Sequence, residues 1–124
     1  MGNMDRLESI VARLPDVARV NIEAWGGEPT FRVVGKNFIF AGEDGRTITV
    51  KLTMEEAAAV VATDPDVVPT GYGLGRAGWV SITLTSRPSA ARWREVEEWI
   101  RTSYTLVAPK RLARQVLEED ETNS

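Results

Sequence analysis

The chain of 124 residues contains no cysteine and no histidine. Without cysteine it has no disulfide, no thiol nucleophile and no cysteine-based metal site. The lack of histidine excludes serine–histidine hydrolysis, cysteine–histidine chemistry and the usual zinc sites, because histidine is the commonest general base near neutral pH and the commonest metal ligand. We therefore expect a protein that is not an enzyme and that holds neither a metal ion nor another cofactor.

Long apolar segments are also missing. No apolar run approaches the roughly 18 residues that a membrane-spanning helix needs, and the first five residues lack the basic start and apolar centre of a signal peptide. We therefore expect a cytoplasmic protein with no membrane contact. Hydrophobic residues make up 43% and charged residues 27% of the chain, which is typical of a soluble globular protein. The length predicts a single domain with its own core.

The acidic residues are unevenly distributed. The net charge is −3, but the four acidic residues at 118–121 account for more than that, and residues 1–117 carry +1. We expect a single domain over residues 1–117 and an acidic disordered tail over residues 118–124. Seven basic and three acidic residues lie between Arg87 and Leu117. This basic block can meet phosphates, or it can be the solvated surface of a helix.

Apolar spacing and capping residues predict four helices. Leu7, Ile10, Val11 and Leu14 form the stripe of an amphipathic helix over residues 4–14. Two further helices are expected over residues 54–63 and 90–104, and a last short helix is expected to start at Ala108-Pro109. Their start signals are the capping box of Thr53 with Glu56, the N-cap residue Ser89 and the helix-starting Pro109.

Strands are expected at residues 17–24 and 79–85. A β-hairpin is expected over residues 25–40, followed by a strand that contains Thr47 to Lys51. If Gly35 and Lys36 form a two-residue turn with glycine first, Val33 faces Phe38 and Phe31 faces Phe40, and these four side chains bury together. A three-residue loop at 43–45 would then pair Phe40 with Ile48 and Phe38 with Val50. This register predicts an outer face made of the following residues: Arg32, Val34, Asn37, Ile39, Thr47, Thr49 and Lys51.

The element order is helix, four strands, helix, one or two strands, and two helices, with residues 64–78 as a loop. Strands that follow one another through tight hairpins form an antiparallel sheet. We therefore expect an α+β fold of two layers, with a sheet of about five strands and helices packed on one face.

Gly73, Gly75 and Gly78 match the G-x-G-x-x-G pattern of dinucleotide-binding proteins. That pattern binds pyrophosphate only between a strand and a following helix. Here a proline-containing loop precedes the glycines and a strand follows, so we reject a cofactor site. A glycine-rich loop carrying Tyr72 and Arg76 is the better interpretation, and such a loop can approach a ligand or a nucleic-acid backbone.

Other side chains allow two interpretations each. Trp79 falls on the polar side of its strand, so it is either a packing aromatic at the sheet edge or a stacking platform for a flat ligand. Lys110 and Arg111 place positive charge at a helix start, where the helix dipole disfavours it. That conflict is typical of a binding role, and a salt bridge to a neighbouring carboxylate explains it equally well.

Taken together, several short blocks make the chain similar to the MmcQ/YjbR family over nearly its full length. The blocks are Trp25-Gly26, Pro29, Phe31-Arg32-Val33, Gly35-Lys36, Phe38, Lys51-Leu52, Gly78-Trp79-Val80, Trp93, Ser103-Tyr104 and Val107-Ala108-Pro109-Lys110. The resemblance implies a small bacterial protein with a frataxin-like or secretion-chaperone-like α+β fold, in a family commonly described as DNA-binding. Relatives often carry histidine where this chain has Gly27 and Arg76, so any histidine-dependent function of theirs is not expected here.

Three functional hypotheses follow. The first is a DNA-binding module of low specificity and modest affinity, whose candidate residues are Arg32, Lys36, Lys51, Arg76, Lys110 and Arg111 for phosphates and Trp79 or Tyr72 for stacking. The second is a protein-interaction or chaperone-like adaptor that uses the exposed sheet face. The third, a small-ligand or enzymatic site near Trp25, Tyr72 and Trp79, ranks last because histidine and cysteine are missing.

Overall fold

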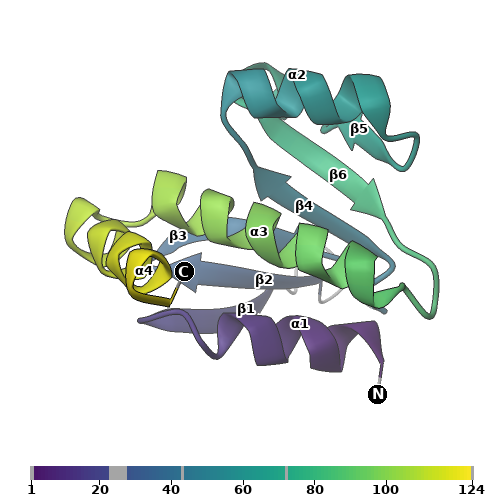
Figure 1. Cartoon of the computed structure of the whole chain (residues 1–124). Helices are drawn as coiled ribbons and strands as arrows, with labels where there is room; N and C mark the ends of the chain where they lie inside the picture. The colour runs from purple at the N-terminus through teal and green to yellow at the C-terminus, as the bar shows by residue number, and fades with distance from the viewer. Residues whose placement is uncertain (1, 23–27, 43, 72, 124) are drawn as a thin grey trace.

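A computed structural model describes residues 2–22, 28–42, 44–71 and 73–123. Its elements follow the predicted order, with one strand and one short 3₁₀ helix in addition (Figure 1). In chain order they are α1 (Asn3–Val11), β1 (Val17–Ile22), β2 (Glu28–Val33), β3 (Lys36–Ala41), β4 (Thr47–Lys51), α2 (Met54–Thr63), β5 (Val67–Pro69), η2 (Leu74–Ala77), β6 (Trp79–Thr83), α3 (Ala90–Val107) and α4 (Lys110–Asn123).

The strands form one antiparallel sheet in the order β1-β2-β3-β4-β6-β5. The helices lie on one face of this strongly twisted sheet, with α3 across β3 and β4 and α2 over β5 and β6 (Figure 1). The predicted two-layer α+β fold is therefore confirmed, and the sheet has six strands rather than about five.

The core lies between the sheet and the helices, and it contains the predicted helical stripes. Leu7, Ile10, Val11 and Leu14 are all buried, although α1 itself ends at Val11. The α3 side chains Trp93, Val96, Ile100 and Tyr104 are buried as well. Both predicted N-caps are present: Thr53 Oγ1 accepts from the Glu56 N–H at 3.1 Å, and Ser89 Oγ accepts from the Arg92 N–H at 3.0 Å.

The β2–β3 hairpin turns one residue earlier than predicted. Val33 pairs with Lys36, so the turn residues are Val34 and Gly35, with φ values of +48° and +79°. Positive φ at both positions makes a type I′ turn, which matches the right-handed twist of the flanking strands. The prediction was wrong because it considered only the preference for glycine at the first position of the turn, and not the twist of the flanking strands. A valine in left-handed backbone is strained, and the twist of the hairpin outweighs that cost.

A β-bulge on β3 then shifts the register. Arg32 pairs with Asn37 but Phe31 pairs with Ile39, which leaves Phe38 as the extra residue. Phe38 and Ile39 are both fully buried, so Ile39 belongs to the core and not to the outer face as predicted. Phe40 is only half-buried.

The β3–β4 connection also differs from the predicted three-residue loop. The Gly42 N–H bonds to the Thr47 carbonyl at 2.8 Å, and Phe40 pairs with Thr49 rather than Ile48. The bulge at Phe38 and this longer connection compensate each other. Thr47, Thr49 and Lys51 still share the outer face with Arg32, as predicted, because the alternation along β4 places Ile48 and Val50 in the core.

Ser103 of α3 completes the β3–β4 ladder where the bulge interrupts it. Its buried Oγ donates to the Phe38 carbonyl at 2.6 Å and accepts from the Lys51 N–H at 2.9 Å. The hydroxyl therefore stands between two backbone groups that would otherwise bond to each other, and it fixes α3 to the sheet.

Residues 64–78, predicted as a loop, contain strand β5 and the 3₁₀ helix η2. β5 is an edge strand that ends at Pro69, a position where proline is tolerated because an edge residue need not donate into the ladder. Gly78 follows η2 with φ of +94°, and a Cβ there would stand 2.2 Å from the Leu52 carbonyl oxygen. The glycine is therefore needed for close approach of two backbone segments and not for phosphate binding.

The C-terminal helix is longer than predicted. α4 continues to Asn123, whereas a disordered tail was expected from Glu118. No glycine or proline follows Pro109, and glutamate is a good helix former, so nothing in the local sequence stops the helix at residue 117. Leu112 and Val116 anchor α4 in the core as predicted.

Candidate functional site

The face of the sheet opposite the helices brings three of the predicted binding residues together. Arg32 is on the outer side of β2, Lys51 is on the outer side of β4, and Trp79 lies directly opposite Lys51 on β6. All three side chains are half-buried, although none of the described helices covers this face. Their partial burial therefore comes from neighbouring side chains on the same face. Their backbone positions are held by the hydrogen bonds between the strands of the sheet.

Trp79 has an aromatic neighbour on this face. Its ring and that of Phe40 are 5.5 Å apart between centroids, with an interplanar angle of 68°, which is an edge-on arrangement that favours an aromatic pair. Beside it, hydroxyl groups of β4, β6 and the residue after β5 are linked: Thr49 Oγ1 lies 2.9 Å from Ser81 Oγ, which lies 3.1 Å from Thr70 Oγ1. The outer face thus combines aromatic surface, hydroxyls and cationic side chains.

Arg32 and its cross-strand neighbour Asn37 carry unused polar atoms. Nε of Arg32 and Oδ1 of Asn37 are both buried, and neither makes a hydrogen bond within the part of the chain that the structure describes. Buried polar atoms without partners are uncommon in native proteins because each costs free energy. The guanidinium of Arg32 is held in the sheet face without a carboxylate to neutralise it among the described residues.

Arg76 lies close to this face, at the end of the sheet where Lys51 and Trp79 meet. It is exposed on η2, and η2 is tied to β5 by the hydrogen bond from the Gly75 N–H to the Thr70 carbonyl at 3.0 Å. The contact of Gly78 with Leu52 holds the other end of the loop. Tyr72, the other predicted residue of this loop, lies outside the described residues.

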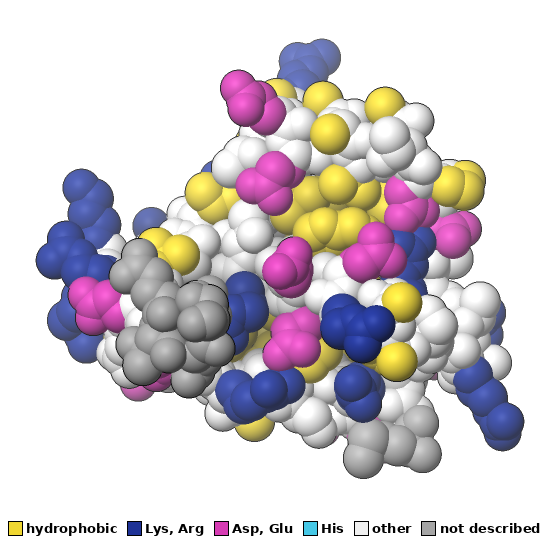
Figure 2. Space-filling view, in the orientation of Figure 1, with side chains coloured by type: hydrophobic (Ala, Val, Ile, Leu, Met, Phe, Trp, Pro, Cys, Tyr) yellow, Lys and Arg dark blue, Asp and Glu magenta, His cyan; other side chains and the backbone are white. Residues whose placement is uncertain are grey.

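The remaining predicted residues lie elsewhere. Lys36 pairs with Val33, whose side chain is buried beneath the helices, so Lys36 stands at the hairpin end on the helix-bearing side. Lys110 and Arg111 open α4, which packs against α3 in the helical layer, and both are exposed. Basic side chains gather over this end of the molecule (left in Figure 2). The predicted single basic surface is therefore divided between two faces.

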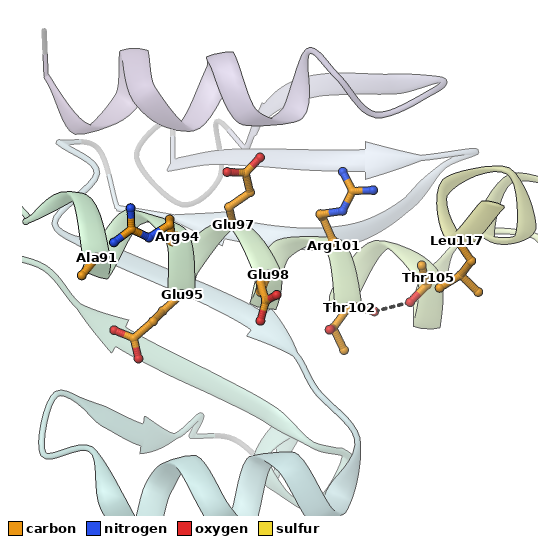
Figure 3. Close-up of a pocket in the computed structure, with 9 residues that line it drawn as sticks. All are labelled: Ala91, Arg94, Glu95, Glu97, Glu98, Arg101, Thr102, Thr105 and Leu117. Carbon is orange, nitrogen blue, oxygen red and sulfur yellow. Dashed lines mark hydrogen bonds between the residues drawn. The ribbon is translucent and has the colours of Figure 1, made fainter. Parts of the chain in front are cut away.

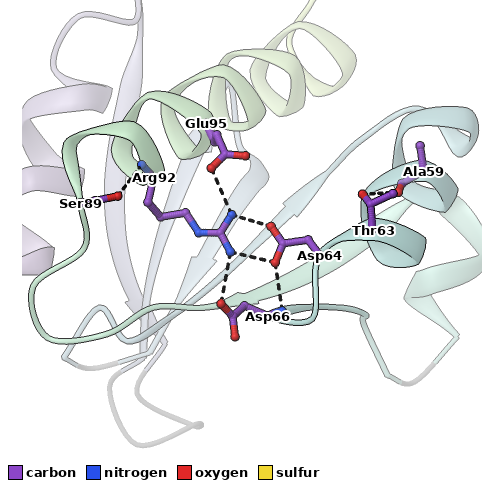
Figure 4. A network of polar contacts seen from close by, with 7 residues as sticks. All are labelled: Ala59, Thr63, Asp64, Asp66, Ser89, Arg92 and Glu95. Atoms are coloured by element: carbon purple, nitrogen blue, oxygen red, sulfur yellow. Dashed lines mark hydrogen bonds and ion pairs between the residues drawn. The ribbon is translucent and has the colours of Figure 1, made fainter.

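Two arginines of the helical layer have roles that the sequence interpretation missed. Arg92 binds both carboxylate oxygens of Asp64, at 2.6 and 2.9 Å, and also reaches Asp66 and Glu95 at 3.4 Å (Figure 4). The hydrogen bonds from Arg92 lower the pKa of Asp64, and those to Asp64 raise the pKa of Arg92. Arg13 pairs with Glu97 at 2.9 Å. The pairs of Arg92 with Asp64 and of Arg13 with Glu97 join segments distant in sequence, and local sequence patterns do not contain that information.

The YjbR family model matches residues 12–106. The chain belongs to the YjbR family. The structure agrees with this assignment, since the chain is similar to the crystal structure of Deinococcus radiodurans protein DR2400, which carries a DUF419 domain. The two share 23% sequence identity with a TM-score of 0.69 over 94% of this chain and 88% of that one. At this identity the similarity establishes the fold alone. No protein with a curated description matches the chain.

In this YjbR-family chain a surface hollow lies along the solvent side of α3 (Figure 3). It measures about 790 Å³, and it is lined by Ala91, Arg94, Glu95, Glu97, Glu98, Arg101, Thr102, Thr105 and Leu117. Its two arginines and three glutamates largely offset one another, so it does not select a ligand of either charge. It is also remote from Trp79, around which a small-ligand site was predicted; Trp25 and Tyr72 lie outside the described residues.

Two further features bear on function. Within residues 2–22, 28–42, 44–71 and 73–123, no group of three or more acidic side chains is arranged to hold a metal ion. Among the helices that the structure describes, none combines the length and the apolar character needed to span a bilayer.

Proposed function

We propose that this YjbR-family protein binds DNA weakly and with low sequence specificity through the helix-free face of its sheet. Arg32 and Lys51 contact phosphates, Arg76 adds a third contact from the neighbouring loop, and Trp79 offers its ring to an unpaired base. The proposed role is binding without catalysis, and it places the protein in the bacterial cytoplasm, where such a ligand is found.

One observation carries the proposal. Two cations and an aromatic ring from three different strands lie on the one sheet face that no described helix covers, and neither cation is in an ion pair within the described residues. Elsewhere Arg13, Arg19 and Arg92 are paired with carboxylates. An unpaired cation in a rigid sheet is available to a phosphate without first breaking an ion pair.

The small number of cations sets the expected strength. With two or three phosphate contacts, affinity for a short oligonucleotide falls roughly 10- to 40-fold between about 50 and 200 mM salt. Fluorescence anisotropy with a labelled single strand and the matching duplex measures this directly. Because stacking needs an unpaired base, we expect the single strand to bind more tightly than the duplex. The absence of binding to both probes at low salt would show that the proposal is wrong.

Matched double variants test the site. Arg32→Gln/Lys51→Gln removes one arginine and one lysine from the sheet face, and Lys110→Gln/Arg111→Gln removes the same pair from α4. We expect the first variant to weaken binding roughly tenfold. It should also make the slope of log affinity against log salt concentration shallower, by the equivalent of about one to two phosphate contacts, and the second variant should have little effect on either quantity. The reverse result would show that DNA contacts the helical layer and that the assignment to the sheet face is wrong. A Trp79→Leu variant should lose the preference for single strands.

A further inference from the structure

The helical layer leaves an apolar strip between α2 and α3. α2 packs on β5 and β6, whereas α3 packs on β3 and β4, so the two helices rest on different strands. Figure 2 shows apolar side chains at the surface between them. We define the apolar strip by residues that α2 and α3 turn toward this surface: Met54, Val60, Val61, Trp99 and Leu106.

Helical spacing places these residues. On α3, Trp99 follows Arg92 by seven residues and Leu106 follows Trp99 by seven, so the three share one flank. Arg92 marks that flank as the one facing α2, because its guanidinium binds Asp64 at the end of α2 and also lies 5.6 Å from the centre of the Trp99 ring. The opposite flank of α3 faces α1, as the pair of Glu97 with Arg13 shows.

The apolar strip is incompletely covered. On α2, Ala57 is buried, but Val60 and Val61, three and four residues further along the same core-facing stripe, are only partly buried against the core. Trp99 is likewise partly buried. At the open end, Met54 is 57% and Leu106 41% exposed. Trp99 and Leu106 are about 10.5 Å apart along the helix axis, which is two helical turns.

The rim of the apolar strip is acidic. Glu95 and Glu98 point from α3 toward the α2 side (Figure 3), and Asp64 and Asp66 close the far end. In the described structure Arg92 pairs with three of these carboxylates, those of Asp64, Asp66 and Glu95, so it sets one positive charge against the four negative charges of the rim. Figure 2 shows acidic side chains around the apolar surface.

We propose that the apolar strip binds an amphipathic helix of a partner protein, with apolar residues spaced over two turns and with lysine or arginine along its flanks. Apolar surface two turns long between two helices suits the i, i+3, i+4, i+7 face of a third helix. Charge complementarity selects basic flanks and rejects acidic ones. This site is on the opposite side of the sheet from the proposed DNA contact and does not depend on it.

Two synthetic peptides test the proposal. Both carry leucine at i, i+3, i+4, i+7 and i+11 on the same helical frame; one has lysine and the other glutamate at the remaining positions. In fluorescence anisotropy with the full chain, we expect the labelled leucine–lysine peptide to bind and the leucine–glutamate peptide to bind at least about tenfold more weakly. Equal binding of the two, or no binding of the leucine–lysine peptide, overturns the proposal.

Paired variants locate the contact. Met54→Ser/Leu106→Ser removes two exposed apolar side chains of the strip, and Val68→Ser/Leu117→Ser removes two others that are 53% and 52% exposed on the outer sheet face and on α4. We expect the first variant to weaken binding of the leucine–lysine peptide by about tenfold and the second to leave it unchanged. All four sites are exposed, so both variants should fold. A loss with the second variant equal to that with the first would overturn the assignment.

Discussion

The hydroxyl of Ser103 joins β3 to β4 through the bulge, and its removal by Ser103→Ala is expected to cost far more than the loss of a single oxygen atom suggests. Ser103 is fully buried. Its Oγ makes hydrogen bonds of 2.6 Å to the Phe38 carbonyl and of 2.9 Å from the Lys51 N–H. Alanine leaves both backbone groups without their partner in a space that is closed to water.

The magnitude follows from those two groups. A buried donor or acceptor that loses its partner costs about 1–3 kcal/mol, so the two together should lower the free energy of unfolding by roughly 2–6 kcal/mol. The bulge keeps Phe38 and Lys51 from closing the gap themselves, since Phe38 is the unpaired residue of its strand. For a domain of typical stability, about 5–15 kcal/mol, this is a large fraction.

Urea denaturation followed by tryptophan fluorescence measures the effect. With a slope of about 2 kcal/mol/M, the midpoint should fall by roughly 1–3 M while the slope itself stays the same. Ser9→Ala is the control, because the Ser9 hydroxyl makes one exposed bond to the Asp5 carbonyl within α1. A shift for Ser103→Ala no larger than that for Ser9→Ala would refute the reasoning, since it would mean that the strands re-form a direct bond.

Two other perturbations test features of the fold. Val34→Asn should raise the free energy of unfolding by about 1 kcal/mol, measured as a higher urea midpoint. Asparagine tolerates the left-handed backbone that Val34 adopts at φ of +48°, and the exposed valine side chain makes little packing contact. An unchanged or lower midpoint would contradict the turn assignment. Asp64→Asn should reduce the decrease in the free energy of unfolding that the protein shows between neutral and acid pH. The pKa of Asp64 is lowered in the folded state by hydrogen bonds from Arg92, so the contribution of this carboxylate is present above its unfolded pKa of about 4 and is lost as pH falls through the folded value. Urea midpoints of both proteins between neutral and acid pH measure this, and an equal decline in the two would contradict it.

Local patterns predicted the elements that local interactions determine. The stripe from Leu7 to Leu14, the caps at Thr53 and Ser89 and the alternation along β6 each depend on residues within a few positions, and each is confirmed. The family resemblance is confirmed over residues 12–106.

The hairpin register could not be predicted in the same way. The bulge at Phe38 is supported by Ser103, which lies 65 residues further along the chain. No pattern around Gly35 contains that information. The predicted outer face survived for Arg32, Lys51 and Trp79 because two register differences offset each other.

The sequence predicted the parts of the candidate site that depend on the alternation of side chains along a strand, and not the parts that depend on turns or on helix packing. Lys36 lies on the helix-bearing side because the turn is one residue earlier, and Lys110 and Arg111 are carried away from the sheet face by the packing of α4 on α3. The sequence placed Asp64 only at the start of the loop predicted over residues 64–78. Its bond to Arg92 links segments 28 residues apart, and such a pair becomes visible only when the chain is folded.

The edge of the sheet at β5 has a consequence for self-association. Along β5, the residues that bond inward to β6 alternate with residues whose amides face the open edge, and the latter are Val67 and Pro69. The Val67 N–H already donates to the Asp64 carbonyl at 3.2 Å, and proline has no N–H to offer. β5 therefore presents no free backbone donor to a passing strand. A strand of another molecule that paired with β5 would meet backbone acceptors but no free backbone donors at this edge. The lack of donors disfavours edge-to-edge pairing and so protects the edge against aggregation.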